Sequence, residues 1–384
     1  YEIPLRLVGS EMCIRDRENT MLTKNRAYNF NAGPSALPLE VLQKAQNELI
    51  DFENSGMSIM EMSHRSVAFE KVHNGAIELL RKIYTIPDNY EVLFLQGGAS
   101  LQFSMIPMNF LTAEKTASYV DTGAWSEKAL KEAKLFGKVH VSASSKEDQY
   151  KYIPSNDVLD FEETDAYVHI TSNNTIFGTQ WKEFPETGDV PLIADMSSDI
   201  LSKPVDVSKF GMIYAGAQKN LGPSGVTVVI VRKDLIENAN TAIPTMLKYT
   251  THSSNNSLYN TPPTFGIYML GEVLKWVEAQ GGLEKITAQN EEKAKLIYDA
   301  IDNSEGFYTG HAVEGSRSLM NITFRVADEA LEKQFLQEAK EAGFVGLNGH
   351  RSVGGCRAST YNAVPVETCA ALSTFMNDFR AKHQ

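Results

Sequence analysis

Short apolar runs alternate with polar stretches of helical length between about residue 90 and residue 233. Each run has the length and boundaries of a strand buried on both faces of a sheet. This βαβ alternation predicts an α/β fold with a mainly parallel sheet covered by helices. The expected strands are Glu91–Leu95, Ala117–Asp121, Lys138–Ser142, Ala166–Thr171, Pro191–Ala194, Gly211–Ala215 and Val226–Val231.

Helical periodicity accompanies these strands. An amphipathic stretch at Ser126–Phe136 predicts a helix between two strands, with Ser126 as its N-cap. Thr264–Ala279 is predicted to be a long helix with an apolar face, ended by Gly281-Gly282. Two earlier helices are expected at Leu39–Phe52 and Ala68–Tyr84.

The pattern changes beyond Gly281, where a smaller α+β domain is expected. Its predicted elements are a helix at Leu283–Asn303, a strand at Met320–Val326, a helix at Asp328–Ala342 and a helix at Val366–Ala381. We therefore expect a large domain over residues 39–280 and a small domain over residues 281–384, joined by the N-terminal segment 21–38. Residues 1–20 lack the continuous apolar core of a signal peptide. They are expected to be a non-native or disordered leader before Met21.

Composition narrows the functional classes. The chain has 384 residues, 42% of them hydrophobic, and a formal net charge of −12. That charge argues against nucleic acid and acidic membrane surfaces as partners. No run approaches the ~20 apolar residues that a membrane helix needs. The three cysteines form an odd number without CxxC or metal-ligand spacing, which fits a reducing cytoplasm.

Asp195 and Lys219 are the most informative pair of polar residues. Each follows an apolar run that reads as a buried strand, so each is expected where a strand leaves the core. Open α/β sheets bind their ligands at that edge. A lysine there can form a Schiff base with pyridoxal phosphate, and a buried carboxylate can pair with the pyridine nitrogen. Either residue alone fits a helix cap or a solvated lysine better, whereas the pair favours the cofactor.

Other candidates admit two interpretations each. Ala99 and Ser100, in Gln96-Gly-Gly-Ala-Ser, form either a phosphate cradle at a helix start or an ordinary glycine turn. Trp125 either stacks on a flat cofactor ring or covers the core. Thr175 either bonds the ring hydroxyl or shapes a turn. Asn260 and Thr261 precede two prolines, so Thr261 is expected as an N-cap with Pro262 at N1, which is also an anion site.

Two basic clusters complete the candidate set. His64 and Arg65 form the first, and His350, Arg351 and Arg357 form the second. Arginine binds carboxylate and phosphate through two parallel hydrogen bonds, although solvated surface arginines are the commoner case. Gly354-Gly355 leads into an expected strand at Cys356–Tyr361, which favours Arg357. Several cations at one site would select a doubly anionic substrate.

The motifs together resemble the phosphoserine aminotransferase family from about Met21 to the C-terminus. The Ala-Gly-Ala-Gln-Lys-Asn and Gly-His-Arg blocks are specific to that family rather than to pyridoxal phosphate enzymes broadly. The matching motifs are Tyr28-Asn-Phe-Asn-Ala-Gly-Pro-Ser, Met62-Ser-His-Arg-Ser, Gln96-Gly-Gly-Ala-Ser, Tyr214-Ala-Gly-Ala-Gln-Lys-Asn-Leu-Gly-Pro-Ser-Gly, Tyr259-Asn-Thr-Pro-Pro-Thr-Phe and Gly349-His-Arg through Arg357-Ala-Ser-Thr-Tyr-Asn.

The resemblance implies a fold-type I homodimer that uses pyridoxal phosphate. It would exchange an amino group between L-glutamate and 3-phosphohydroxypyruvate, giving phosphoserine and 2-oxoglutarate. It leaves open activity on the four-carbon phosphorylated keto acid of vitamin B6 synthesis. Ser100 stands where some members of the family carry arginine, and the leader has no family counterpart.

The resemblance also implies a role for each candidate residue. Lys219 is the Schiff-base lysine and acid/base, and Asp195 pairs with the pyridine nitrogen. Arg357 binds the substrate α-carboxylate. The remaining assignments are Trp125 on the ring face, Thr175 on the ring hydroxyl, Ala99, Ser100 and Gln218 on the cofactor phosphate with Asn260 and Thr261 of the neighbouring subunit, and His64 and Arg65 of that subunit with His350 and Arg351 on the distal anion.

Two alternatives stay open at this level. The first is another pyridoxal phosphate enzyme of related fold, such as an alanine–glyoxylate-type aminotransferase or a cysteine desulfurase. A desulfurase needs a nucleophilic cysteine on a mobile loop, whereas Cys356 and Cys369 are expected in a strand and a helix. The second is a catalytically idle protein that binds the cofactor, against which Lys219, Asp195 and the basic clusters argue.

Overall fold

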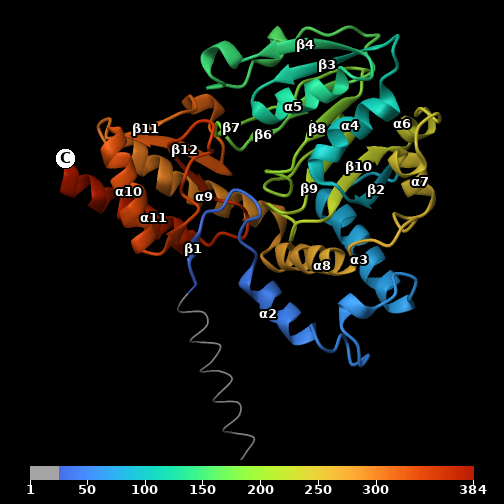
Figure 1. Ribbon diagram of the computed structural model, residues 1–384, viewed down its shortest axis with the longest axis horizontal. Helices are drawn as coiled ribbons and strands as arrows, with labels where there is room; N and C mark the ends of the chain where they lie inside the picture. The colour runs from blue at the N-terminus through green and yellow to red at the C-terminus, as the bar shows by residue number, and fades with distance from the viewer. Residues whose placement is uncertain (1–25) are drawn as a thin grey trace, which may run out of the picture.

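The computed structural model describes residues 26–384, and the expected leader at residues 1–20 lies outside this range. A seven-stranded sheet forms the centre of the larger part of the molecule (Figure 1), in the order β2-β10-β9-β8-β5-β3-β4. Strand β10 pairs antiparallel with β2 and β9, and every other pair in this sheet is parallel, so the predicted, mainly parallel sheet is confirmed. The strands are β2 (Tyr90–Leu95), β3 (Thr116–Asp121), β4 (Lys138–Ser144), β5 (Val168–Thr171), β8 (Leu192–Asp195), β9 (Met212–Gly216) and β10 (Thr227–Arg232).

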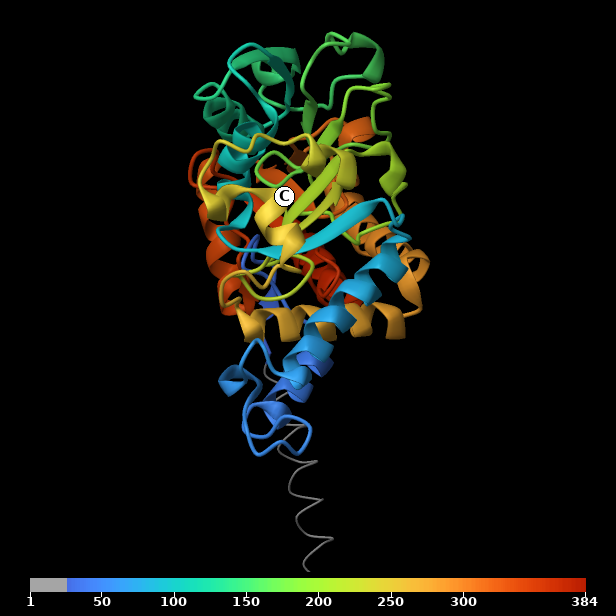
Figure 2. The same cartoon turned by 90° about the vertical axis from the view of Figure 1, so that its right-hand side faces the viewer.

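Each face of this sheet carries its own hydrophobic core, because side chains alternate along every strand. In β2, Val92 and Phe94 join the core that holds α3 and α8, whereas Leu93 and Leu95 join the core that holds α4 and α5. Figure 2 shows the long helices α3 and α8 crossing below the sheet. The helices of this part are α2 (Leu39–Glu48), α3 (Val67–Tyr84), α4 (Gly98–Phe110), α5 (Ala124–Ala133), α6 (Lys233–Glu237), α7 (Tyr249–Ser254) and α8 (Thr264–Ala279).

The sequence predicted where the helices lie better than it predicted the residues at which they start. Helix α8 has the predicted bounds, and α2 ends at Glu48 rather than at Phe52. Ser126 is not an N-cap, because α5 begins at Ala124 after Gly123, and the Ser126 side chain instead accepts the Gly123 N–H. The cap prediction for Thr261 is also wrong, because α8 begins at Thr264 with Pro263 in the cap position. Pro262 precedes Pro263, and a residue before proline avoids helical geometry.

A separate hydrophobic core, here called the second core because it belongs to the second part of the molecule, lies beyond α8. It is built on the antiparallel sheet β11-β12-β14 and covered by α10 and α11, to the left in Figure 1. The N-terminal strand β1 (Tyr28–Asn29) pairs in parallel with β13 (Phe344–Val345), so the start of the described chain packs here. The other elements are α9 (Gly282–Asp302), β11 (Tyr308–Gly310), β12 (Asn321–Val326), α10 (Glu329–Glu341), β14 (Cys356–Ser359) and α11 (Val366–His383).

Helix α9 connects the two parts. Its first turns, with Leu283 and Ile286, pack into the core below the large sheet, whereas Ala294 and Ile297 pack into the second core. A short hairpin, β6 (Asn173–Asn174) and β7 (Thr179–Gln180), follows β5 at the edge of the large sheet. Within residues 26–384, no helix combines the length and apolar composition needed to cross a membrane.

Candidate active site

Asp195 and Lys219 lie at the same edge of the large sheet. Asp195 is the last residue of β8, and β9, after which Lys219 follows by three residues, runs parallel beside it. Parallel neighbours bring their carboxyl ends to one edge, so both side chains reach one cavity of about 270 Å³. Both residues therefore lie near strand ends, as the sequence predicted, and both line the same cavity.

The pKa of the Lys219 amine is lowered by its surroundings. Burial lowers its pKa to about 8, Asp195 acts in the opposite direction by attraction, and the positive charge of Arg357 lowers the pKa further. About a tenth of the amine is therefore unprotonated at pH 7, far more than for a lysine with the ordinary pKa of 10.5. An amine in that state can act as a nucleophile or as a base.

Asp195 is buried, and burial raises the pKa of its carboxyl. Ser197 opposes that rise, because its backbone N–H and its hydroxyl donate to Asp195 Oδ1 at 3.0 and 2.7 Å. Within residues 26–384, no hydrogen bond reaches Asp195 Oδ2. A cationic ring nitrogen placed in the cavity would therefore find an acceptor there.

Trp125, Thr175 and Arg357 form a connected wall of the cavity. Trp125 Nε1 donates to Thr175 Oγ1 at 3.1 Å, and Arg357 Nη1 donates to Thr175 O at 3.1 Å. The buried Nε of Arg357 has no hydrogen-bond partner in the described part of the chain. A buried cationic N–H without an acceptor is costly, and a ligand carboxylate would satisfy it.

The N-terminus of α4 forms the opposite wall. Gly97 takes a left-handed conformation, with φ of 89°, and Gly98, Ala99 and Ser100 follow it along the cavity. Leu101 is the residue whose N–H bonds back to Gly97 O. The preceding N–H groups have no partner within the helix, and the helix dipole is positive at this end. This is the geometry expected of an anion cradle.

The cavity gathers most, but not all, of the candidate residues. Those that line it are Ala99, Ser100, Trp125, Thr175, Asp195, Gln218, Lys219, His350 and Arg357. Asn260 instead donates to Gln96 at 3.2 Å and lines a neighbouring cavity. Thr261, Arg351 and Arg65 are exposed, and His64 is partly exposed, all outside the lining of the main cavity.

Several lining residues escaped the sequence analysis. Ser197 holds Asp195, and its position two residues after a strand-end aspartate was the available signal. Asn173 and Ser198, which bond each other at 2.7 Å, carry no distinctive pattern. The others are Ala32, Gly33, Gly98, Thr171 and Ile176.

The residues present fit pyridoxal phosphate by the chemistry of their donors. The cavity offers an amine of lowered pKa, a buried carboxylate, an indole and a helix N-terminus, which match the aldehyde, pyridine nitrogen, ring face and phosphate. The partnerless Nε of Arg357 matches the carboxylate of an amino acid. Among residues 26–384, no cluster of His, Cys, Asp and Glu suits a metal ion.

Known proteins are similar in sequence to this chain over almost its whole length. The sequence profile of the family Aminotransferase class-V matches residues 27–372. The chain is 74% identical to a phosphoserine aminotransferase of Lysinibacillus sphaericus, over 94% of this chain and 99% of that protein.

Two solved structures extend the likeness to the fold. The structure of the phosphoserine aminotransferase from Bacillus circulans subsp. alkalophilus is 60% identical, with a TM-score of 0.92 over 94% of this chain and 99% of that one. The pyridoxal phosphate-bound phosphoserine aminotransferase of Trichomonas vaginalis is 40% identical, with a TM-score of 0.87 over 92% of this chain and 100% of that one. The chain therefore belongs to the phosphoserine aminotransferases, within the class-V aminotransferase family.

Proposed function

We propose that this chain transfers the amino group of L-glutamate to 3-phosphohydroxypyruvate, giving O-phospho-L-serine and 2-oxoglutarate. The observation that carries the proposal is the meeting of Lys219, Asp195, Trp125 and Arg357 around one cavity, beside the N-terminus of α4. The high identity to phosphoserine aminotransferases supports the choice of substrates.

Pyridoxal phosphate fits the cavity through side chains of both walls. Lys219 would hold it covalently through Nζ, and Asp195 would accept a hydrogen bond from the pyridine nitrogen. Trp125 would cover the ring face, Thr175 would contact the ring hydroxyl, and Ala99, Ser100 and Gln218 would hold the phosphate. When bound, the cofactor supplies an electron sink for the charge left as an amino acid loses its α-proton.

The protein's own contribution to the reaction is proton transfer and positioning. Lys219 Nζ, once free and neutral, removes the α-proton and later returns it, because its lowered pKa lies near the working pH. Arg357 binds the α-carboxylate that both amino acids and both keto acids carry, and its unpartnered Nε gives that contact a second donor. His350 also lines the cavity, where it would contact the distal anion.

The site is completed by a second copy of the chain in this proposal. Residues 49–67, here called the projecting segment, extend away from the sheet below α3 in Figure 2 and include His64 and Arg65. Ile50 and Val67 near its two ends are 84% and 82% exposed, and Met57 and Met60 are about half exposed, at 45% and 53%. Apolar exposure of this kind is typical of a surface covered by a partner. A homodimer would bring His64 and Arg65, with Asn260 and Thr261, to the partner's cavity, beside Arg351.

We also propose the division of the chain at Gly281 into a large and a small domain, because separate cores lie on either side of it. The cytoplasm is the proposed location, supported by the free, buried thiols of Cys356 and Cys369. The four-carbon phosphorylated keto acid of vitamin B6 synthesis carries the same two anionic groups, and we propose it as a second substrate.

The desulfurase alternative is disfavoured by both described cysteines. Cys356 lies in β14 and Cys369 in α11, and both are buried. Burial raises the pKa of the Cys356 thiol well above its usual range and that of Cys369 to about 12. Neither sulfur is therefore a competent nucleophile at neutral pH.

A half-reaction on the purified protein tests the proposed function. L-Phosphoserine and L-alanine are added separately, without keto acid, and the visible absorbance of the bound cofactor is followed. With phosphoserine only, we expect loss of the band, conversion of the bound cofactor to pyridoxamine phosphate and release of 3-phosphohydroxypyruvate. Conversion by alanine and not by phosphoserine would move the chain to the alanine-type enzymes, and no band after adding pyridoxal phosphate would remove the cofactor.

A further inference from the structure

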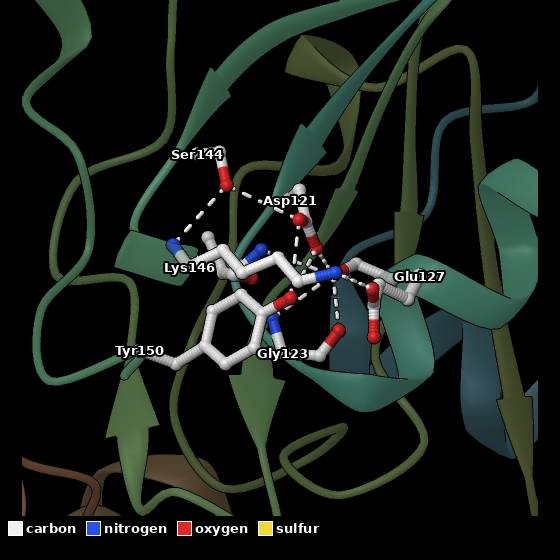
Figure 3. Close-up of polar contacts among 8 residues, drawn as sticks. Asp121, Gly123, Glu127, Ser144, Lys146 and Tyr150 are labelled. Carbon is white, nitrogen blue, oxygen red and sulfur yellow. Dashed lines mark hydrogen bonds and ion pairs between the residues drawn. The ribbon is translucent and has the colours of Figure 1, made fainter. Parts of the chain in front are cut away.

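Asp121 is a buried carboxylate at the end of β3, just before the turn that carries Trp125. Its side chain is outside the cavity lining and is 6% exposed. Three hydroxyl groups surround it, as Figure 3 shows in part. Ser126 Oγ donates to Oδ1 at 2.9 Å, Ser144 Oγ donates to Oδ2 at 3.1 Å, and Tyr150 OH lies 3.3 and 3.1 Å from the two oxygens.

Ser126 links Asp121 to the backbone of the turn by hydrogen bonds. Its Oγ accepts the N–H groups of Thr122 and Gly123 at 2.9 and 3.0 Å, while its own hydrogen is within reach of Asp121 Oδ1 and Gly123 O. The turn also packs tightly against the hairpin, because a Cβ at Gly123 would lie 2.8 Å from Asn174 Oδ1. Asp121 thus fixes one side of the turn, and Asn174 limits the other.

Trp125 lies between these restraints and the cofactor cavity. It is the second residue of α5, two residues beyond the anchored Gly123, and its indole N–H reaches Thr175 next to Asn174. A displacement of the turn would therefore move the indole against Thr175. Thr175 holds the Nε1 edge of the ring, Lys128 Nζ lies 4.3 Å from its centroid, and the side chain packs against the core beside α4 and α5. Lys128 belongs to the same helix as Trp125, so the turn that starts this helix sets the position of the ring against Thr175.

Tyr150 shows that the arrangement is maintained at a conformational cost. It adopts a left-handed backbone, with φ of 56°, although it is a bulky residue buried to 5% exposure. Its ring packs on Phe177 at 4.8 Å between centroids. Burial, and then the negative charge of Asp121, raises the pKa of Tyr150, which keeps its hydroxyl a proton donor.

Asp121 receives hydroxyl donors rather than a direct cation. The nearby Lys146 donates to Glu127 instead, and among residues 26–384 no ion pair to Asp121 occurs (Figure 3). A buried carboxylate whose hydrogen bonds all come from hydroxyl groups is an unusual choice where packing is the sole need, because an apolar group would pack at lower desolvation cost.

We propose that Asp121, itself held by Tyr150, is a positioning residue for the cofactor ring that acts through Ser126 to set the plane of the Trp125 indole. The inference rests on the proposed function, in which Trp125 covers that ring. It assigns a role in cofactor affinity and orientation to a hydroxyl-lined carboxylate that does not touch the cavity.

Two variants, Asp121→Asn and Tyr150→Phe, test this role against a matched control, Tyr308→Phe. Tyr308 is also buried and donates its hydroxyl to Met376 O at 2.8 Å, but it belongs to the second core. The measurements are hydrogen exchange of the peptide covering residues 121–126, the dissociation constant of pyridoxal phosphate, and the circular dichroism of the bound cofactor.

We expect both test variants to exchange the Thr122 and Gly123 amides about tenfold faster and to bind the cofactor about tenfold more weakly, as suits loss of a hydrogen bond to a charged group. Their visible dichroism should fall, whereas Tyr308→Phe should change only the melting temperature. If the test variants matched the control in exchange, affinity and dichroism, the positioning role would be wrong. Should Asp121→Asn not fold, Tyr150→Phe decides alone. Absence of cofactor binding by the wild type would instead defeat the proposed function, while the exchange data would still report on the turn.

Discussion

Two buried lysines show why a shifted pKa does not by itself identify a catalytic residue. Burial lowers the pKa of both Lys219 and Lys293 to about 8. Lys219 faces the cavity between Asp195 and Arg357, whereas Lys293 is enclosed and donates to Tyr361 O at 2.7 Å. The difference lies in what each amine can reach, and only Lys219 can reach a small molecule.

The reactivity of Lys219 should depend on the protonation state of its own amine. We expect the rate at which cofactor-free protein captures pyridoxal phosphate covalently to rise with pH around a midpoint near 8, because the neutral amine is the nucleophile. Borohydride reduction and mass spectrometry measure the trapped product, and Lys219→Ala is the control without capture. A midpoint near 10.5, the ordinary lysine value, would contradict this assignment.

The charges beside Lys219 predict in which direction the pH midpoint should shift when either is removed. Asp195 raises the pKa of Lys219, so Asp195→Asn should shift the midpoint to lower pH at saturating cofactor. Arg357 lowers the same pKa, so Arg357→Ala should shift it to higher pH. Shifts of the same sign in both variants would mean that the midpoint belongs to another group.

At the scale of elements, α9 joins the core below the large sheet to the second core. Asn290 donates to Ser202 O at 3.1 Å on one side and to Asn362 Oδ1 at 2.9 Å on the other. Lys293 follows one turn later and is 1% exposed, without an acidic partner in the described ion pairs. Its ammonium group is therefore buried at a cost wherever it remains protonated.

The cost of burying the charged Lys293 should make the free energy of unfolding depend on pH. The pKa of Lys293 is about 8 in the folded protein and about 10.5 when unfolded, so the unfolded chain binds more protons between these values. The free energy of unfolding should therefore increase by roughly 1 to 3 kcal/mol as the pH rises from 8 to 10.5, because the buried amine no longer carries a charge in the folded protein. Urea unfolding of the wild type should show this rise relative to Lys293→Met. The exposed Lys285→Met on the same helix should follow the wild type, and a pH dependence unchanged in Lys293→Met would refute the account.

Elements were predictable from the sequence where a repeating pattern defined them. All seven expected strands of the large sheet occur within two residues of their predicted starts, because buried parallel strands leave continuous apolar runs. Helix starts were less accessible. Ser126 has the residue type of an N-cap but serves as the reciprocal partner of Gly123, and Thr261 precedes two prolines that delay the helix.

The candidate site shows the same division. Lys219 and Asp195 could be predicted because strand ends mark them. Trp125, Thr175 and Arg357 were candidates from their local sequence, each with a second interpretation, and the family resemblance assigned their roles. The link from Trp125 to Thr175 crosses 50 residues of sequence and depends on how the hairpin lies against the turn. Ser197 and Asp121 act through hydrogen bonds, for which single serines and aspartates leave no local pattern.

At the scale of the whole molecule, the cavity of one chain has fewer cations than the substrate has charges. A phosphorylated keto acid carries a carboxylate and a phosphate, whereas the cationic or basic side chains lining the cavity in residues 26–384 are Lys219, Arg357 and His350. Burial and nearby cations lower the pKa of His350, which weakens its charge at neutral pH. Arg65, exposed on the projecting segment, is the arginine that the proposed homodimer would add.

Mixing two inactive variants tests whether Arg65 serves the partner's site. Lys219→Ala lacks the amine and Arg65→Ala lacks the distal cation, so each homodimer should have little or no activity at limiting substrate. After mixed refolding in equal amounts, half of the dimers are hybrids in which one site combines Lys219 of one chain with Arg65 of the other, so about a quarter of wild-type activity should return. If Arg65 instead acted within its own chain, every site in the hybrid would lack one group and mixing would restore nothing. Because restoration requires both an interface and a site built across it, the experiment examines the assembly and the role of the projecting segment together.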